Sequence, residues 1–482
     1  MQKSPRLVDL HGTETIAPGF ALAFQGWTMP DTPLSAPEAL ALAAQLRETN
    51  ASALALREAL QRRQKPWGAV PIKARLKVLR RFRRRLWRVI PELLRLIPDH
   101  APADVMTAEI LPLIAAIRFL ERKAVGLLKE KSLSPFGRPF WLSGLDTRVR
   151  RRPLGAVLII APGNYPLMLP GIQVVQALAA GNAVALKPAP GRTALLARFV
   201  LLLEEVGLPH GVLKLIPEED GPSASAAGYD LIILTGSEAT GREVARAAAE
   251  TATPTIMELS GADPVFVLPC ADLALVARAL HFGLTLKQGA TCIAPRRVFV
   301  DATHKPVLFA LLRHLLDKAP IRSSSSGAVD ALVGRALQMG APVSREGGAT
   351  ILSLTSDQAS LADQDVFAPW LALITVRDMA EALTLERGSR HVLGASIFGS
   401  RRDAWRLARQ IGAGTITVND LIVPSADPRL SFGGSKCSGH GVTRGREGLL
   451  AMTRPVSVST RRWNALHLTA RIRVLHARFN SR

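Results

Sequence analysis

The hydrophobic and polar positions along the chain change their period near residue 153. Before this point, apolar residues recur at steps of three and four, which is typical of amphipathic helices. The pattern predicts helices over residues 35–63, 72–97 and 104–130. After it, short apolar runs alternate with helix-length segments. Strands that alternate with helices indicate βαβ units and a mostly parallel sheet, so we expect an α/β fold.

The second part of the chain divides into two series of strands. The first series is predicted from four apolar runs, AVLIIA, NAVALKP, GVLKLIP and YDLIILTG, with helices at 171–180, 192–206 and 240–251. The second series is predicted near residues 264–268, 296–300, 351–354, 371–376 and 415–418. The segment from Pro153 to Leu186 has no charged residue, but prolines and glycines interrupt it. It is therefore interpreted as buried strand, loop and helix rather than as a membrane span.

The charge of the chain is unbalanced, with 61 Lys and Arg against 39 Asp and Glu and a net charge of +22. Residues 57–95 hold 14 basic and two acidic residues, and smaller basic excesses lie at 148–152 and 461–482. Such patches raise nucleic acid or an anionic membrane as partners. Aromatic residues make up only 5% of the chain, which argues against base stacking, and no nucleic acid partner is expected.

Cysteine and histidine usage sets the compartment and excludes a metal. Three cysteines without a CxxC pair are typical of a reducing setting, and the first 20 residues lack the apolar region of a signal peptide. We therefore expect a cytoplasmic location. No histidine spacing matches a metal site, so no metal is predicted. Cys270 and Cys437 are expected to be packing residues, and His440 a structural one.

Candidate chemistry is carried by single residues near strand ends, because no GxGxxG, Walker or GxSxG motif is present. Cys292 precedes a predicted strand and is either a buried small residue or a nucleophile. Glu258 lies in an apolar turn. It is either an acid whose pKa is raised by burial or a structural carboxylate in an ion pair. Asn164 follows a strand and also fits a simple turn residue.

Two further positions fit either a ligand or an ordinary structural role. Lys187 ends a strand, where a solvated lysine is the default. Gly236, Ser237 and Gly241 open a predicted helix, whose free N–H groups suit a phosphate although a plain N-cap explains them equally well.

Taken together, seven segments resemble the aldehyde dehydrogenase superfamily in type and order: APGNYP, ALKPAP, LTGSEATG, MELSGADP, GATCIAPRR, QDVFAPW and SFGGSKCSGHG. The resemblance extends from about residue 66 to 458. It implies NAD(P)-dependent oxidation of an aldehyde to a carboxylic acid. Cys292 then matches the nucleophile that forms a thiohemiacetal and a thioester, Glu258 the general base, and Asn164 the amide of the oxyanion hole.

The resemblance also implies a cofactor site for NAD or NADP. The matching positions are Pro162, Lys187, Gly236, Ser237, Gly241, Asp365 and Phe367. Where the family commonly has Glu, this chain has Asp365, one methylene shorter. Members that prefer NAD often carry an acid three residues after the ribose-binding lysine, where this chain has Pro190. Both cofactors therefore remain open.

The family architecture implies a Rossmann-like cofactor domain, an α/β catalytic domain and a small β oligomerisation arm. We assign residues 1–129 and 151–257 to the cofactor domain and 258–455 to the catalytic domain. The arm comprises 130–150 and 456–482, with a basic C-terminal tail, and implies a homodimer or homotetramer. The 57–95 segment is expected to form the outer face of one helix, and residues 461–482 could contact an anionic membrane or a partner subunit.

Two alternatives stay open beside this interpretation. A CoA-acylating relative would pass the acyl group to CoA rather than to water, although such members generally lack the Glu base. A non-catalytic scaffold would use the basic patches to bind anionic membrane or nucleic acid, although it would not need Cys292, Glu258 and Asn164 together.

Overall fold

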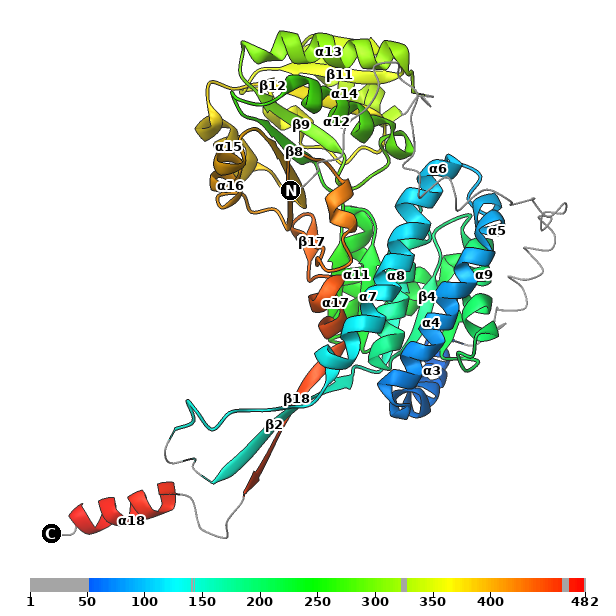
Figure 1. Ribbon diagram of the computed structural model, residues 1–482, viewed down its shortest axis with the longest axis vertical. Helices are drawn as coiled ribbons and strands as arrows, with labels where there is room; N and C mark the ends of the chain where they lie inside the picture. Colours follow the sequence, from blue (N-terminus) through cyan, green and yellow to red (C-terminus); the bar gives the residue numbers. More distant parts are fainter. Residues whose placement is uncertain (1–51, 140–141, 143, 322–326, 462–467, 481–482) are drawn as a thin grey trace, which may run out of the picture.

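The computed structural model describes residues 52–139, 142, 144–321, 327–461 and 468–480. It consists of two α/β lobes and an arm of long strands that extends away from both (Figure 1). Each lobe is built around its own sheet, and within both sheets the strands that follow one another through helices are parallel. The prediction of an α/β fold is therefore confirmed.

The first lobe contains a six-stranded sheet whose central strands are buried on both faces. Parallel strands covered by helices are expected to be continuous apolar runs, as AVLII is here. The strand order is β17 (Gly439–His440), β7 (Thr255–Glu258), β6 (Leu231–Thr235), β3 (Ala156–Ile160), β4 (Ala183–Lys187) and β5 (Leu213–Leu215). Only β17 runs antiparallel to its neighbour. The residues of β17 thus come from far along the chain to close this sheet.

Helices cover both faces of the first sheet. They are α3 (Ala53–Ala69), α4 (Ile72–Arg88), α5 (Ile90–Arg95), α6 (Pro102–Asp104), η1 (Val105–Ile110), α7 (Leu111–Leu128), α8 (Met168–Ala180), α9 (Thr193–Glu205), α10 (Gly221–Ser225), α11 (Glu238–Ala249) and α17 (Gly445–Ala451). The prediction of one helix over 72–97 is wrong, because the chain breaks at Val89. Pro91 lies in the first turn of α5, where it lacks an N–H and its ring opposes continuation of α4. Of the predicted helix at 35–63, the part before residue 52 lies outside the described residues.

The second lobe contains a seven-stranded sheet with helices on both faces. Its order is β10 (Val343–Glu346), β11 (Ala349–Leu354), β12 (Trp370–Thr375), β9 (Pro295–Val300), β8 (Asp263–Val267), β14 (Gly394–Phe398) and β15 (Thr415–Val418). The covering helices are α12 (Leu273–Thr285), α13 (His304–Lys318), α14 (Gly327–Gln338), α15 (Met379–Gly388) and α16 (Arg401–Ala408). Two separate clusters of buried apolar residues occupy the two faces of this sheet.

The arm is an antiparallel sheet of β1 (Lys131–Ser132), β2 (Leu145–Pro153) and β18 (Thr453–Arg461). β18 pairs with β2 along its whole length, and its other edge has no partner among the described strands. Helix α18 (Leu468–Asn480) follows β18 in the chain and is drawn beyond the arm in Figure 1. The boundaries of the three predicted domains stay a prediction, although Leu449 and Met452 belong to the core of the first lobe.

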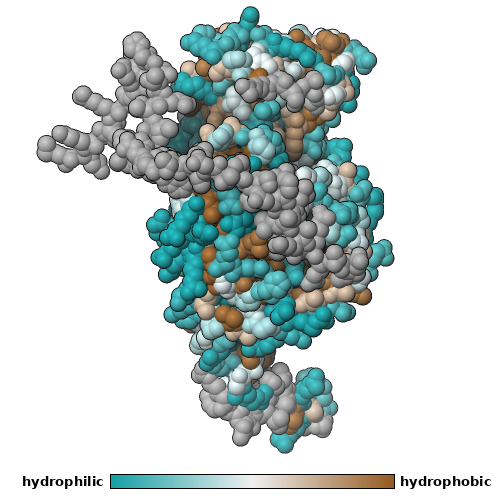
Figure 2. Space-filling model, turned by 90° about the vertical axis from the view of Figure 1, so that its right-hand side faces the viewer, coloured by the Kyte–Doolittle hydropathy of each residue, from teal (hydrophilic) through white to brown (hydrophobic). Residues whose placement is uncertain are grey.

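The basic segment at 57–95 does not form the outer face of a single helix, as the pattern predicted. It spans α3, α4 and α5, and Arg75 is buried, donating hydrogen bonds to the carbonyls of Ala179 and Val70. Arg83 forms a salt bridge with Glu121. Part of the positive charge therefore ties helices together. Figure 2 shows hydrophilic residues over most of the visible face, with hydrophobic ones in scattered patches. No helix among the described residues is long and apolar enough to cross a bilayer.

Candidate active site

A cavity of about 330 Å³ is lined by residues of both lobes. Its walls are mostly apolar and come from η1, α7 and α8 in the first lobe and from α12 and the loops around residues 292 and 423 in the second. The lining residues are Thr107, Ala108, Pro112, Tyr165, Met168, Leu169, Phe282, Leu286, Thr291, Cys292, Ile293, Ile422, Val423, Ser425, Ala426, Phe432 and Arg444. Of the predicted site residues, Cys292 alone is in this lining.

Cys292 lies in a tight turn between the short helix η4 (Leu286–Gly289) and β9. Its side chain is half-buried. Burial raises the pKa of the thiol to about 12, against the opposing effect of the positive charge of Arg444, while the charges of Asp263 and Glu258 raise it further. The thiol therefore needs help to ionise near neutral pH, because the thiolate is the reactive form.

A glycine brings the turn after Glu258 against the Cys292 turn. A Cβ atom on Gly261 would lie 2.7 Å from the carbonyl oxygen of Cys292 and 2.7 Å from Oδ1 of Asp263, closer than real Cβ contacts allow. Only glycine therefore fits between the two backbones. This close approach links the end of β7, in the first lobe, to the start of β9, in the second.

Glu258 is the last residue of β7 and is 3% exposed. Its carboxylate accepts hydrogen bonds from the hydroxyl of Thr443 and, at 3.3 Å, from the hydroxyl of Thr235. Burial raises its pKa, against the charge of Arg444 and these two hydrogen bonds. A carboxyl group with a raised pKa is a better proton acceptor near neutral pH than an ordinary one.

Asn164 lies after β3 and contacts the loop that carries Cys292. Its Nδ2 donates to the carbonyl of Ala290 at 3.1 Å, and its Oδ1 accepts from the backbone N–H of Tyr165 at 3.0 Å. The Tyr165 hydroxyl lies 3.0 Å from that of Thr291. These contacts hold the two loops together within two residues of Cys292. In the described part of the chain, no hydrogen bond joins Asn164 or Glu258 directly to the thiol.

A fully buried ion pair supports this loop contact from behind. Both side chains, Lys287 and Glu109, are 0% exposed and form a salt bridge. The Lys287 ammonium also donates to the carbonyl of Asn164 at 2.7 Å and lies 3.7 Å from the centre of the Tyr165 ring. Glu109 in turn accepts from the N–H of Leu167 at 3.2 Å. Burial lowers the pKa of Lys287 and raises that of Glu109, against their mutual attraction.

The predicted cofactor residues of the first lobe gather at one sheet edge. The carboxyl ends of β3, β4 and β6 lead to Pro162, Lys187 and Gly236. β3 is central, and the chain order reverses between β3 and β6, which is where open parallel sheets bind their ligands. Ser237 caps α11 through the N–H of Thr240, as an ordinary N-cap does.

The remaining cofactor candidates differ in their surroundings. The nearest atom that a Cβ on Gly236 would meet is 3.4 Å away, in the flexible side chain of Leu234, so a ligand can approach the backbone of Gly236 closely. Gly241 is buried, and a Cβ there would meet the side chain of Leu259 at 2.7 Å, which makes it a packing glycine. Asp365 and Phe367 lie in the second lobe before β12, and both are exposed.

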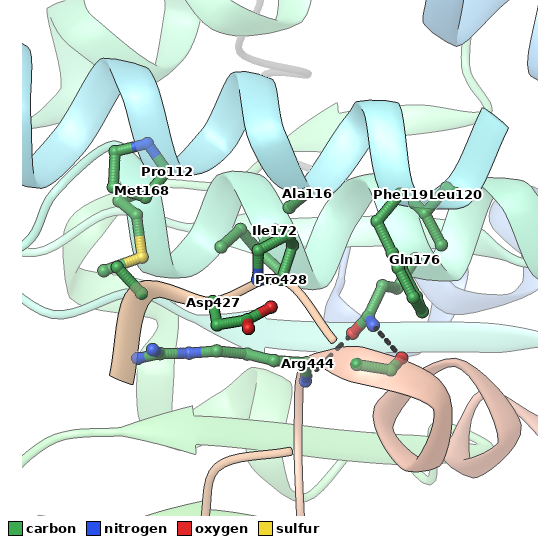
Figure 3. Close-up of a pocket in the computed structure, with 12 residues that line it drawn as sticks. Pro112, Ala116, Phe119, Leu120, Met168, Ile172, Gln176, Asp427, Pro428 and Arg444 are labelled. Carbon is green, nitrogen blue, oxygen red and sulfur yellow. Dashed lines mark hydrogen bonds between the residues drawn. The ribbon is translucent and has the colours of Figure 1, made fainter. Parts of the chain in front are cut away.

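Sequence reasoning missed Arg444, Lys287 and Glu109. Arg444 lines the cavity of Cys292 and also a narrower one beneath α7 and α8, where Figure 3 shows it beside Gln176. The available signals were weak: Lys287 and Glu109 are isolated charges within otherwise apolar segments. Two lesser predictions differ in outcome. Cys270 is exposed, so the prediction that it is a packing residue is wrong. The ring of His440 lies 2.8 Å from the Thr255 hydroxyl, a contact that agrees with the predicted structural role. No group of metal-ligating side chains occurs among the described residues.

The comparison with family models decides the identity of the fold. The model of the aldehyde dehydrogenase family matches residues 36–458. The chain belongs to the aldehyde dehydrogenase family. This membership confirms the prediction from the sequence motifs of an oxidoreductase that oxidises aldehydes with NAD or NADP.

Individual relatives agree with this assignment. The chain is 30% identical over 421 residues to a 4,4'-diapolycopene aldehyde oxidase of Methylomonas sp, covering 82% of this chain and 79% of that protein. It is 30% identical over 438 residues to a geranial dehydrogenase of Castellaniella defragrans, covering 84% and 89%.

Solved aldehyde dehydrogenase structures share the fold. One from Mycobacterium tuberculosis, complexed with NAD⁺, has a TM-score of 0.78 at 24% identity and covers 86% of this chain and 92% of its own. An NADP-dependent glyceraldehyde-3-phosphate dehydrogenase of Bacillus halodurans, complexed with NADP, has a TM-score of 0.76 at 26% identity, covering 85% and 91%.

Proposed function

We propose that this aldehyde dehydrogenase uses Cys292 as its nucleophile and releases a carboxylic acid by hydrolysis of a thioester. The observation that carries the proposal is the position of Cys292 in the wall of the apolar cavity. The turn after Glu258 lies against the Cys292 backbone at Gly261, and the Asn164 amide is bonded to the same loop at Ala290.

The first step is attack of the Cys292 thiolate on the aldehyde carbon, which gives a thiohemiacetal. Asn164 uses Nδ2 for the Ala290 carbonyl, and its second N–H remains for the developing oxyanion. The backbone N–H of Cys292 would be the other donor. Removal of one such donor typically costs about 2.7–4 kcal/mol of transition-state stabilisation.

The later steps convert the thiohemiacetal into a free acid. Bound NAD(P) would supply the acceptor for the hydride of the thiohemiacetal carbon, and the acyl group would then remain on Cys292 as a thioester. Water then attacks the thioester, and Glu258 takes a proton from it as general base. The buried carboxyl, with its raised pKa, suits this transfer. The thiol is regenerated when the carboxylic acid leaves.

The carboxyl ends of the strands in the first sheet form a surface that fits the cofactor. The open backbone at Gly236 and the start of α11 would hold the pyrophosphate, and Lys187 the adenosine ribose. Pro162, Ser237, Asp365 and Phe367 complete the proposed contacts. Glu218 lies near Lys187. Its carboxylate accepts a hydrogen bond from the N–H of Gly191 at 3.1 Å, and its negative charge raises the pKa of Lys187, against the effect of burial.

This carboxylate supplies the acid that is missing at Pro190. It would repel a phosphate on the ribose, so we propose a preference for NAD. Titration of the protein with NAD and NADP, followed by fluorescence, measures the two dissociation constants. Glu218→Gln should narrow the difference between them, and equal constants in the wild type would contradict the preference.

The substrate that fits the cavity is an apolar aldehyde. Its walls are mostly hydrocarbon and aromatic, and Phe282 and Val423 are exposed by 39% and 55%, which places them at its mouth. Two similar proteins are named for diapolycopene aldehyde and geranial, whose aldehyde groups end unsaturated hydrocarbon chains. We expect higher kcat/KM for such aldehydes than for short or charged ones in a panel assay.

The arm supports a homodimer or homotetramer. One edge of β18 pairs with no other strand that the structure describes, and the strand is exposed along most of its length. Such an edge is a template for pairing with another strand. Light scattering after gel filtration would give the mass, and Val456→Pro in β18 should lower it. Residues 461–482 are also proposed to contact anionic membrane, which sedimentation with anionic and neutral vesicles at low salt tests.

Two variants test the proposed chemistry. Cys292→Ser should bind NAD normally but form no acyl-enzyme. Glu258→Gln should accumulate acyl-enzyme, seen as a burst of reduced cofactor followed by slow turnover. Rapid steady turnover by Glu258→Gln would contradict the role of Glu258 as base. An acyl-CoA product in the presence of CoA would instead favour the acylating alternative, and no reduction of either cofactor across the aldehyde panel would favour a scaffold.

A further inference from the structure

Arg444 adopts a backbone conformation that arginine rarely adopts. It precedes α17 with φ 62° and ψ 174°, a region that is essentially confined to glycine and that costs other residues about 1–3 kcal/mol. Its N–H donates to Oε1 of Gln176 at 3.3 Å, and its carbonyl accepts from the N–H of Gly448 at 2.7 Å. Figure 3 shows Gln176 reaching this segment from α8. The surrounding contacts thus hold Arg444 in place against its own preference.

The Arg444 side chain is buried and incompletely paired. It is 8% exposed, and Nη1 donates to the carbonyl of Ser425 at 3.3 Å. The guanidinium lies 4.3 Å from the centre of the Phe432 ring. Its Nε has no hydrogen-bond partner, and no carboxylate among the described residues forms an ion pair with it. The nearby Asp427 pairs with Arg429 instead.

Such a cation is costly unless it interacts with a negative charge. A buried charge without a partner loses its hydration, and natural proteins rarely keep one without a function. Arg444 lines the same cavity as Cys292. The charged groups that act on the thiol are Arg444, Asp263 and Glu258. Two of them are acids that oppose ionisation, so Arg444 is the one that favours the thiolate.

We propose that Arg444 activates Cys292 electrostatically, by stabilising its thiolate and the oxyanion that forms after attack. The proposal rests on the proposed nucleophilic role of Cys292 and extends it to a residue that the motifs do not include. Since a low-dielectric cavity screens charges weakly, a guanidinium in its lining acts on a thiolate in the same lining. A purely structural Arg444 would only join Ser425 to the Phe432 ring.

The pH dependence of thiol alkylation separates these two roles without turnover. Iodoacetamide reacts with the thiolate, with loss of iodide, so the rate follows the ionised fraction of Cys292. The rate is measured from pH 6 to 10 by mass spectrometry of the peptide that contains Cys292, without cofactor. The full chain carries Cys270→Ala and Cys437→Ala, so that Cys292 is the remaining thiol.

Arg444→Met should raise the pKa of the thiol by about one to three units, because an opposite charge is lost. Below that pKa the change appears as slower alkylation at every pH of the series. Alkylation at pH 7 would then be at least about tenfold slower. Arg444→Lys, which keeps the charge, should stay close to the wild type. Arg446→Met is the matched control, because it removes an exposed arginine two residues away. It should leave the profile unchanged.

Two results would overturn the proposal. One is an unchanged profile in Arg444→Met that remains folded by circular dichroism. The other is an Arg444→Lys profile that moves upward by one unit or more although the charge is retained, and this test suffices if the Met variant does not fold. Failure of the proposed function gives a different result. The wild type would then form no acyl-enzyme, while alkylation of Cys292 would still be slower in Arg444→Met than in the wild type.

Discussion

Lys287 and Arg444 are two buried cations that each contact an aromatic ring of the same cavity, Tyr165 and Phe432, and their surroundings differ. Lys287 has a carboxylate partner, a carbonyl acceptor and an aromatic face, all satisfied. Arg444 has one long hydrogen bond and an aromatic face, and its Nε has no partner. Neither belongs to the motifs by which the sequence resembles its family.

The difference separates a positioning role from an electrostatic one. The charge of Lys287 is compensated by Glu109, so it acts little on the cavity. The ammonium instead fixes the carbonyl of Asn164 and the ring of Tyr165. Arg444 has no ion-pair partner among the described residues, and its charge acts on Cys292 and on the buried carboxyl of Glu258. A buried pair is sensitive to loss of one member, whereas a buried cation that lacks a partner has less stability to lose.

The largest expected effect comes from breaking the Lys287 pair. Glu109→Ala leaves a fully buried ammonium without its carboxylate, which typically costs about 3–5 kcal/mol in the free energy of unfolding. Urea unfolding of the purified variant measures this loss. Glu130→Ala serves as the control, because Glu130 pairs with Arg148 at the surface and should change stability by less than about 1 kcal/mol. Equal losses in the two variants would contradict the distinction.

Replacing both members separates stability from positioning. Glu109→Leu with Lys287→Met removes both charges, and such replacements are often neutral or stabilising. The double variant should therefore unfold close to the wild type. Its kcat should nevertheless fall, because the Asn164 carbonyl loses its donor and the oxyanion hole loosens. Wild-type kcat in the double variant would show that the pair does not position Asn164.

A smaller, pH-dependent effect is expected from Asp263, which opposes Arg444 at Cys292. Burial raises its pKa to about 7, against a hydrogen bond from the N–H of Gly394 and the charge of Arg297. The folded-state pKa thus lies above the unfolded one, near 3.8. Its stability contribution is present below about pH 4 and is lost as the pH rises through 7.

Asp263→Asn should remove this dependence. The stability difference between variant and wild type should shift in favour of the variant by about 1–3 kcal/mol between pH 5 and pH 8. Urea unfolding across this range measures it. The same variant should speed alkylation of Cys292 near pH 8, opposite to Arg444→Met, because a negative charge that raises the pKa of the thiol is lost. A stability difference that does not vary with pH would show that Asp263 does not titrate there.

Much of the fold could be predicted from local patterns. The strand predicted near 264–268 is β8 (Asp263–Val267), because a strand buried on both faces is a continuous apolar run. β14 (Gly394–Phe398) was missed, since GASIF begins with small residues. β7, which ends in Glu258, was also missed, because TIME is short and mixes polar with apolar residues.

The site was predictable only where motifs mark it. Cys292, Glu258 and Asn164 follow from their sequence contexts, although their roles stay predictions. The Lys287–Glu109 contact joins residues 178 positions apart, and no local period encodes such a pairing. The burial of Arg444 depends on Phe432, Ser425 and Gln176, and the Gln176 contact joins positions 268 residues apart, which no local pattern marks.

The smallest effect is expected from Arg444→Met on stability. The variant loses a hydrogen bond and a cation–π contact, each worth about 1 kcal/mol. It also removes the unpaired Nε, whose burial costs about 1–3 kcal/mol, while the strained backbone is unchanged. The free energy of unfolding should therefore stay within about 1 kcal/mol of the wild type by urea titration, far from Glu109→Ala. A loss as large as that of Glu109→Ala would mean that Arg444 is held for stability, as Lys287 is.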